Sequence, residues 1–377
     1  MRLRHEQVIL MCTLVLLVVG LGMVFSASAR HGDGWMFLKR QLVNAAVGIA
    51  VFLCASRVDY RFWSRISRMA IMLSFLGLVA LFLAETVRGA QNWLSLPGAR
   101  TFQPVEFARV ALILFLASEM ARLGPRLTSF RQGFLPLLAV TAAVVLLVIK
   151  HNDFGSAMAL CLIAFTMFFV GGVRLLHLTA SAGTLLASAA AVAVVRPHVM
   201  ERFRAFLNPD AYASGLAYQS LQSQLYIGSG GLFGKGLGEG VAKYGYLPDA
   251  HTDFIFSVMG EEIGFIGCLF VLSLFLLLVA RSVRVSRNQE EPFGQMVALG
   301  VGMSIFWYLM LNVLVATRLF PVTGLPMPFI SYGGSALVSH MFAVGILCNI
   351  ALRTETPRAV RRRPWLARRQ RSVEVMS

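Results

Sequence analysis

An imidazole and a carboxylate lie two residues apart at His251 and Asp253, directly before a long apolar run that begins at Phe254. A carboxylate at the edge of such a run is costly to bury, and burial raises the pKa of a carboxylate toward the range useful to a general base. His251 could orient Asp253 or share a proton with it. Asp253 could instead cap the N-terminus of the helix that follows, which is a common role for aspartate.

Further charged side chains lie inside or beside apolar runs. Glu106 and Arg109 are three residues apart, so they share a helix face and can pair. Asp153 precedes one apolar run, and Arg40 lies near the start of another. Charged groups within a membrane normally face the interior of a bundle or a water-filled cavity. These residues are therefore candidates for a polar site, although the Glu106–Arg109 pair could be purely structural.

Two segments are too rich in glycine or proline for a regular helix. The glycine-rich segment, residues 228–240, contains Lys235, but Gly236 follows the lysine and the pattern of a P-loop fails. It is either a flexible loop or a backbone surface that approaches a bulky ligand, with Lys235 supplying charge. The Pro-Gly segment, residues 321–335, holds three prolines and three glycines. At membrane depth it must line a cavity or pack against protein.

The composition is that of a membrane protein. Of the 377 residues, 57% are hydrophobic and 14% are charged, whereas soluble domains carry about 25% charged residues. The net charge of +16 is spread over short clusters between apolar runs and over a basic C-terminal tail, a distribution that argues against nucleic-acid binding. The five cysteines stand singly in apolar runs, so neither a disulfide framework nor a zinc site is indicated.

Ten apolar runs are long enough to cross a membrane as helices, which predicts an all-α polytopic protein. Arg and Lys are more frequent in the short loops that a cytoplasmic N-terminus would place inside, so we expect both termini in the cytoplasm. We expect one transmembrane domain over residues 1–352, with an outer loop over 196–253 between the seventh and eighth helices. A disordered basic tail over 353–377 would follow in the cytoplasm and contact anionic membrane lipids. The ten runs cover residues 8–26, 42–57, 69–84, 105–121, 134–150, 155–173, 175–195, 254–280, 293–316 and 333–352.

Several motifs, in the same order along the chain, are similar to those of the SEDS family, the FtsW/RodA/SpoVE proteins of bacterial cell-wall synthesis. The most specific are His-Thr-Asp-Phe-Ile-Phe at 251–256 and Pro-Phe-Ile-Ser-Tyr-Gly-Gly-Ser at 328–335. Residues 216–219 and 243–251 look closer to FtsW than to RodA. The remaining similar motifs are Gln91-Asn92-Trp93-Leu94, Phe102-Gln103-Pro104-Val105-Glu106, Asn152-Asp153-Phe154-Gly155, Gln222-Ser223 and residues 227–238.

The resemblance implies a SEDS-type fold of ten helices and a peptidoglycan glycosyltransferase of the bacterial inner membrane. Such an enzyme polymerises lipid II at the outer face, together with a class B penicillin-binding protein and other proteins of division or elongation. By this resemblance Asp253 is the essential carboxylate, and Trp93, Glu106 and Arg109 occupy further motif positions. The chain departs from the family at Val105, where serine is usual, and at Arg109, where lysine is frequent.

The implied reaction is an inverting transfer that needs one base. The donor is an α-linked sugar pyrophosphate and the product is β-1,4-linked, so Asp253 alone would suffice to deprotonate the attacking hydroxyl. The leaving pyrophosphate needs cations, and Mg²⁺ or Mn²⁺ could share that task. The candidate cationic residues are Arg40, Arg109, Arg202, Arg204 and Lys235. The other candidate substrate-binding residues are Trp93, Gln103, Glu106, Asp153, Gln222, His251 and Ser331.

Two other functions would use the same features. A lipid II flippase also needs an amphipathic cavity with buried charges, and it would move lipid II across liposome membranes without chain growth. A non-catalytic scaffold would recruit or activate the penicillin-binding protein whether or not Asp253 is present. Glycan polymers made by the purified protein with its partner and lipid II would separate the three functions.

Overall fold

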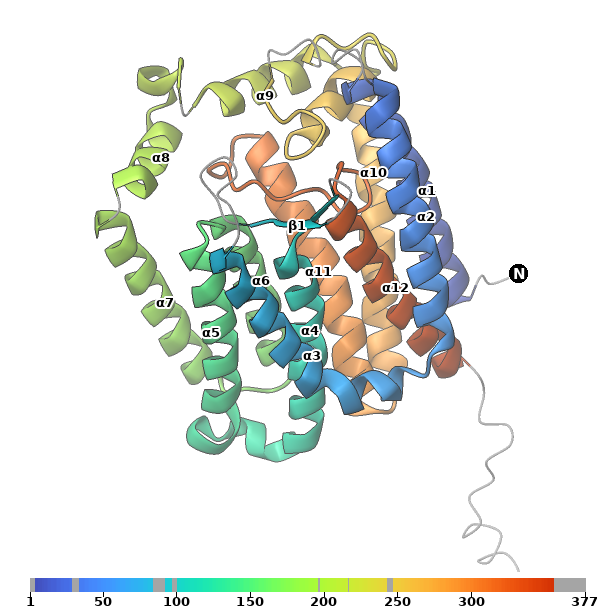
Figure 1. Cartoon of the computed structure of the whole chain (residues 1–377), viewed down its shortest axis with the longest axis vertical. Helices are drawn as coiled ribbons and strands as arrows, with labels where there is room; N and C mark the ends of the chain where they lie inside the picture. Colours follow the sequence, from blue (N-terminus) through green and yellow to red (C-terminus); the bar gives the residue numbers. More distant parts are fainter. Residues whose placement is uncertain are drawn as a thin grey trace, which may run out of the picture.

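The computed structural model describes residues 4–28, 34–83, 92–96, 100–195, 197–215, 217–242 and 247–355. Within these ranges the chain is mainly helical, with one antiparallel pair of short strands, β1 (Leu94–Leu96) and β2 (Arg100–Phe102) (Figure 1). The helices are α1 (His5–Ser28), α2 (Gly34–Arg57), α3 (Tyr60–Ala80), α4 (Pro104–Leu123), α5 (Leu135–Lys150), α6 (Phe154–Val170), α7 (Leu175–Val195), α8 (Pro197–Leu207), α9 (Tyr218–Ser229), α10 (Ile255–Asn288), α11 (Pro292–Ala316) and α12 (Gly334–Glu355). Short helical turns lie at Leu81–Leu83, Gly124–Thr128, Phe130–Phe134 and Pro209–Tyr212.

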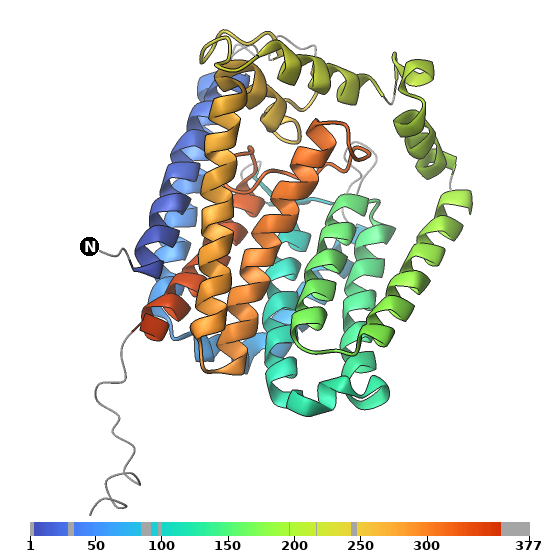
Figure 2. The ribbon, with the colours of Figure 1, turned by 180° about the vertical axis from the view of Figure 1, so that it is seen from behind.

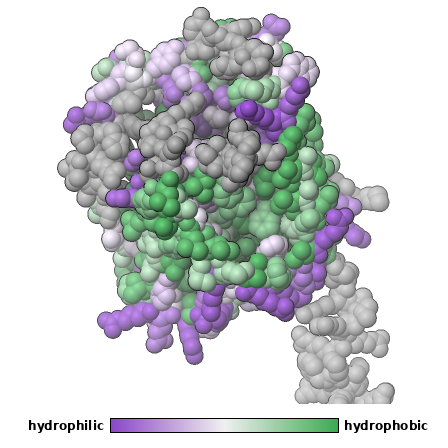
Figure 3. All heavy atoms as spheres, in the orientation of Figure 1, coloured by the Kyte–Doolittle hydropathy of each residue, from purple (hydrophilic) through white to green (hydrophobic). Residues whose placement is uncertain are grey.

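A helix lies in each of the ten apolar runs predicted from the sequence. In the part of the chain that the structure describes, seven helices are long and apolar enough to cross a membrane, and α6 is a shorter apolar helix. Figure 3 shows a broad hydrophobic zone across the middle of one face, with hydrophilic side chains gathered below it. The prediction of an all-α polytopic membrane protein is therefore confirmed. The basic tail predicted over 353–377 lies almost entirely outside the described residues, which end at residue 355.

The interior of the bundle is built around α4, α11 and α12. α4 packs beside α3, α11 and α12, and most of its residues are buried, among them Glu106 and Arg109. The outer helices α2 and α3 instead expose apolar side chains such as Val47 and Leu76. A helix that is apolar on all sides suits a membrane, because one face packs on protein and the other meets lipid. Glu106 and Arg109 of α4 are enclosed by protein.

The outer loop predicted over residues 196–253 contains two helices, α8 and α9, at the end of the molecule where α10 begins and α11 ends (Figure 2). On α8, Ala205 is buried, while the apolar side chains of Phe203 and Leu207 are exposed. α9 is attached to the bundle through Ser223, whose hydroxyl donates to the carbonyl of Ala316 at 2.6 Å. This part of the chain is therefore more regular than its polar composition predicts.

Helix α10 is interrupted at Gly264, whose φ of 66° is far from helical. The glycine-rich segment occupies the interruption and supplies backbone partners to both sides of it. An ideal Cβ on Gly264 would lie 2.2 Å from the amide nitrogen of Gly234, so the two main chains approach as only glycine permits. The backbone hydrogen bonds are Lys235 N to Glu261 O at 2.9 Å, Gly236 N to Glu262 O at 3.0 Å, Phe265 N to Gly231 O at 2.9 Å and Ile266 N to Leu232 O at 3.1 Å.

Candidate active site

The backbone around Asp253 is fixed by a buried amide from α11. The Nδ2 of Asn312 donates to the carbonyl of Asp253 at 2.9 Å and to the carbonyl of Leu325 at 2.8 Å. Leu325 belongs to the Pro-Gly segment, so one side chain joins two segments about seventy residues apart in sequence. Buried carbonyls of irregular backbone need such partners, because the helices around them supply none.

Ser331 makes a second connection between the same two segments. Its hydroxyl donates to the carbonyl of Thr252 at 2.6 Å and accepts from the amide of Met327 at 2.8 Å. The amide of the next residue, Tyr332, donates to the carbonyl of His251 at 2.9 Å. Both contacts of the Ser331 side chain are with backbone atoms. Its position therefore suits holding residues 251–253 in place better than contacting a ligand.

The carboxylate of Asp253 is half-buried and borders Gly324 of the Pro-Gly segment. Its Oδ2 lies 3.6 Å from the point that a Cβ on Gly324 would occupy, and Gly324 has a φ of +72°. The N-cap residue of α10 is Phe254, whose side chain makes no capping hydrogen bond. Asp253 lies one residue before this N-cap position. Asp253 remains the candidate base.

The ring of His251 lies in an aromatic group with Phe37 of α2 and Tyr332. The ring centroids of His251 are 5.0 Å from Phe37 and 5.7 Å from Tyr332. Gln41, one turn along α2, donates to the carbonyl of Ser331 at 3.3 Å. Arg40 is the neighbour of Gln41 and is exposed. Phe37 and Gln41, in the first half of α2, thus contact the segments that carry His251 and Ser331.

Glu106 and Arg109 pair as their spacing predicts, with Arg109 Nη2 3.0 Å from Glu106 Oε2 and both side chains only 1% exposed. The guanidinium also lies over the ring of Tyr308, 4.5 Å from its centroid. It contacts His340 at 2.8 Å and the hydroxyl of Ser339 at 2.6 Å. A further hydroxyl, that of Ser304 on α11, accepts from Arg109 Nη1. Arg109 therefore joins α4, α11 and α12 through protein groups.

Asp153 caps α6 and is buried, with its Oδ1 accepting from the amide of Ser156 at 2.9 Å. Burial raises the pKa of Asp153 to about 6, the hydrogen bonds from Ser156 oppose that rise, and the charge of Glu106 adds to it. A Cβ on Gly155 would lie 2.4 Å from the carbonyl of Thr323. The start of α6 therefore touches the Pro-Gly segment next to Gly324, which brings Asp153 into the surroundings of Asp253.

Trp93 and Gln103 flank the two short strands. Trp93 is half-buried and leads into β1, while Gln103 follows β2 and precedes α4. β1 and β2 pair with Leu94 opposite Phe102. The amide of Gln103 donates to the hydroxyl of Ser335 at 3.0 Å, which ties the strands to the start of α12.

Lys235 forms an ion pair with a carboxylate of the protein. Its Nζ lies 2.7 Å from Oε1 of Glu261, a carboxylate on α10 that is completely buried. Glu261 also accepts from the amides of Val241 and Ala242, each at 2.9 Å. The neighbouring carboxylate of Glu262 accepts from the hydroxyl of Ser26 on α1 at 2.6 Å and from the amide of Gly238 at 3.1 Å. Glu261 and Glu262 were missed from the sequence, although two adjacent carboxylates in an apolar run were a signal for them.

The remaining candidates lie on α8 and α9. Arg204 of α8 is exposed, and Arg202 belongs to the same helix. Gln222 of α9 is half-buried next to Ser223. Among the side chains that the structure describes, no three or more His, Cys, Asp or Glu residues are grouped to hold a metal ion.

Comparison with known proteins gives one consistent result. The chain is 39% identical over 358 residues to a Trichlorobacter lovleyi protein named "Probable peptidoglycan glycosyltransferase FtsW", covering 92% of this chain and 93% of that protein. It is 36% identical over 354 residues to the stage V sporulation protein E of Bacillus subtilis, covering 92% and 96% of the two chains.

Solved structures agree with these sequence relatives. A chain from a structure described as "Structural coordination of polymerization and crosslinking by a peptidoglycan synthase complex" superposes with a TM-score of 0.77 at 26% identity, covering 92% of this chain and 98% of that one. The rod shape determining protein RodA of Thermus thermophilus superposes with a TM-score of 0.69 at 26% identity, covering 92% and 96%. The cell cycle protein profile of FtsW, RodA and SpoVE matches residues 6–356. The chain therefore belongs to the FtsW/RodA/SpoVE family of cell cycle proteins.

Proposed function

We propose that this protein is a peptidoglycan glycosyltransferase that polymerises lipid II into glycan strands. The observation that carries the proposal is the placement of Asp253, a half-buried carboxylate whose backbone is fixed by Asn312 and whose Oδ2 borders Gly324. Relatives at 39% identity bear the name of this activity. A fixed carboxylate at the junction of two irregular segments is the arrangement that a general base requires.

In this mechanism Asp253 takes the proton from the attacking sugar hydroxyl as its oxygen bonds to the anomeric carbon of the donor. The bond from that carbon to the pyrophosphate oxygen breaks, and undecaprenyl pyrophosphate leaves with the electron pair. Attack from the opposite face converts the α-linked donor into a β-1,4 product, so no covalent enzyme intermediate is needed. His251, packed between Phe37 and Tyr332, would orient the segment that carries the base.

The leaving pyrophosphate requires positive charge close to it. Lys235 and Arg109 are engaged in ion pairs with Glu261 and Glu106, so their charge is already used in holding the fold. Arg40 is exposed on α2 and Arg204 is exposed on α8. We propose Arg40 first for the pyrophosphate contact, because its helix also carries Phe37 and Gln41, which contact His251 and Ser331.

The proposed setting is the bacterial inner membrane, with ten spans and both termini in the cytoplasm. One transmembrane domain would cover residues 1–352, and the basic tail would touch anionic lipids. The site would then face outward, together with α8 and α9, and the polyprenyl chain would lie between helices. The proposed partner is a class B penicillin-binding protein in the division machinery, in keeping with the FtsW names of the relatives and the synthase complex among similar structures.

The test is polymerisation of lipid II by the full-length protein reconstituted in vesicles with its penicillin-binding partner. Asp253→Asn should abolish glycan polymers while expression and partner binding stay normal. The control is Asp210→Asn, which removes an exposed carboxylate of the outer part of the chain and should leave polymerisation intact. Full activity in Asp253→Asn would refute the mechanism. Lipid II transfer across the vesicle without polymers would indicate a flippase, and partner activation that is insensitive to Asp253 would indicate a scaffold.

A further inference from the structure

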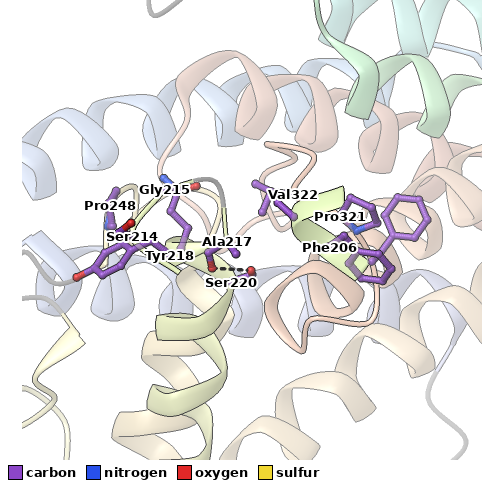
Figure 4. A pocket seen from close by; sticks show the side chains of 12 residues that line it. Phe206, Ser214, Gly215, Ala217, Tyr218, Ser220, Pro248, Pro321 and Val322 are labelled. Carbon is purple, nitrogen blue, oxygen red and sulfur yellow. Dashed lines mark hydrogen bonds between the residues drawn. The ribbon is translucent and has the colours of Figure 1, made fainter. Parts of the chain in front are cut away.

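A cavity of about 450 Å³ opens between α8, α9 and the Pro-Gly segment. Its lining includes Phe206 of α8, Tyr218 and Gln219 at the start of α9, and Pro321 (Figure 4). In Figure 4, Phe206 and Pro321 lie at one end of the view, while Tyr218, Ser214 and Pro248 lie at the other. This volume is within the range of pockets that take a small organic ligand, about 300–1,000 Å³.

The cavity adjoins the base through two stretches of chain. Pro321 and Val322 line it, and Gly324, two residues later, borders the Asp253 carboxylate. Pro248 also lines it, and the carbonyl of the next residue, Asp249, accepts from the amide of Asp253 at 3.1 Å. A ligand in the cavity would therefore lie beside the reaction centre without occupying it.

Among the lining residues that the structure describes, none carries a charged side chain. These described residues offer a pyrophosphate no cation, and a fatty or polyprenyl chain would cover the polar groups of Ser214 and Gln219 without bonding to them. The two rings of Phe206 and Tyr218 offer flat apolar surfaces, and hydroxyl and amide groups offer donors and acceptors. A pyranose ring has both an apolar C–H face and a polar rim, so this lining matches it.

We propose that the cavity is a binding site for a neutral saccharide, a sugar unit of the glycan next to the bond being formed. The proposal rests on the proposed function, since it assigns a substrate subsite to the same reaction. The saccharide could belong to the lipid-free part of the growing strand or to the head of lipid II, and the experiment below separates these sources.

Binding is measured on the full-length Asp253→Asn protein, in which turnover cannot interfere. The probes are a lipid-free oligosaccharide of N-acetylglucosamine and lipid II, and the readout is the Kd of each. Tyr218→Ala should weaken oligosaccharide binding about tenfold, a loss expected when one aromatic face is removed. Tyr218→Phe keeps the ring and should retain most of the affinity. Leu225→Ala, at an exposed position on the same helix, should change nothing.

Weaker oligosaccharide binding in Tyr218→Ala supports a site for the growing strand, while a loss confined to lipid II supports a site for its sugar head. Equal affinities of the parent and Tyr218→Ala proteins for both probes, or no binding of either probe, would overturn the proposal. These measurements do not depend on polymerisation, so a failure of the proposed function would appear separately in the Asp253 test. In the active protein, Tyr218→Ala should also shorten the glycan products.

Discussion

The hydroxyl of Ser331 lies 2.6 Å from the backbone carbonyl of Thr252, the residue directly before Asp253. The same hydroxyl accepts from the amide of Met327. One side chain thereby fixes the distance between the Pro-Gly segment and the candidate base. Ser331 thus positions Asp253 through the backbone of the preceding residue.

Replacing Ser331 by alanine should lower kcat for polymerisation by about tenfold to a hundredfold, because the base shifts relative to its substrate. Each backbone group left without a partner also costs about 1–3 kcal/mol, so the melting temperature in detergent should fall. The matched control is Ser229→Ala, which removes an exposed serine bonded only to the carbonyl of Tyr226. Unchanged kcat in Ser331→Ala at a normal expression level would show that this hydroxyl does not position the base.

Arg109 provides a test of buried charge. Arg109→Ala leaves the carboxylate of Glu106 buried and unpaired, which costs about 3–5 kcal/mol. Removing both charges, as in Glu106→Gln with Arg109→Met, should destabilise the protein less than Arg109→Ala alone. The melting temperatures of the single and double variants in detergent decide this order. If the double variant is the less stable one, the network stabilises the fold through more than charge pairing.

Gly264 should not tolerate a side chain. A Cβ there would lie 2.2 Å from the amide nitrogen of Gly234, and the φ of +66° adds backbone strain. We expect Gly264→Ala to reduce both folded yield and polymerisation severely. Gly22→Ala is the control, since nothing lies within 4 Å of its added Cβ and alanine favours a helix. Comparable yields of the two variants would contradict the tight contact at the interruption of α10.

Glu261 and Lys235 should respond unequally to truncation. Glu261 is fully buried and holds the amides of Val241 and Ala242 as well as Lys235. Glu261→Ala leaves two amides and the Lys235 ammonium without their acceptor. Lys235→Ala removes the counter-charge of a buried carboxylate, which costs stability, but that carboxylate keeps its hydrogen bonds from both amides. Limited proteolysis of the glycine-rich segment should be accelerated far more by Glu261→Ala. Equal acceleration by the two changes would place the stabilising contact in the ion pair alone.

Asp153 should make stability fall as pH rises. Its folded-state pKa of about 6 lies above the ordinary value of 3.8, so between these values the folded protein keeps a proton that the unfolded chain has lost. The stabilisation that this proton confers is fully present below pH 3.8 and is lost as the pH rises through about 6. The free energy of unfolding falls by about 3 kcal/mol over this range. Asp153→Asn keeps the helix cap and should flatten this fall. Melting temperatures of parent and variant across that range give the measurement, and identical pH profiles would contradict it.

Local sequence signals predicted the parts of the site that depend on local chemistry. Glu106 and Arg109 pair because residues three apart share a helix face. The Pro-Gly segment is irregular up to the start of α12 because its prolines cannot continue a helix. Asp253 was singled out as a carboxylate at the edge of an apolar run and by a motif of the family, and Ser331 lies in another such motif. The structure adds that the hydroxyl of Ser331 bonds to the backbone of Thr252.

Contacts between distant segments were not accessible to the same reasoning. Glycine is common in membrane helices, so Gly264 gave no sign that α10 is interrupted. Glu262 accepts a hydrogen bond from Ser26, 236 residues away, and no spacing rule connects the two. Ser304, Ser339 and His340 meet Arg109 only because α4, α11 and α12 pack together. α8 and α9 were missed because their polar composition is also that of a loop.

The approach of Gly234 and Gly264 has a genetic consequence. A Cβ on Gly264 would meet the amide nitrogen of Gly234, and a Cβ on Gly234 would lie 2.2 Å from the carbonyl oxygen of Glu262. Main-chain atoms oppose each other in both directions, so no exchange of side chains can make room for the added atom. Suppressors of Gly264→Ala should accordingly be true revertants, and the two positions should not evolve as a compensating pair.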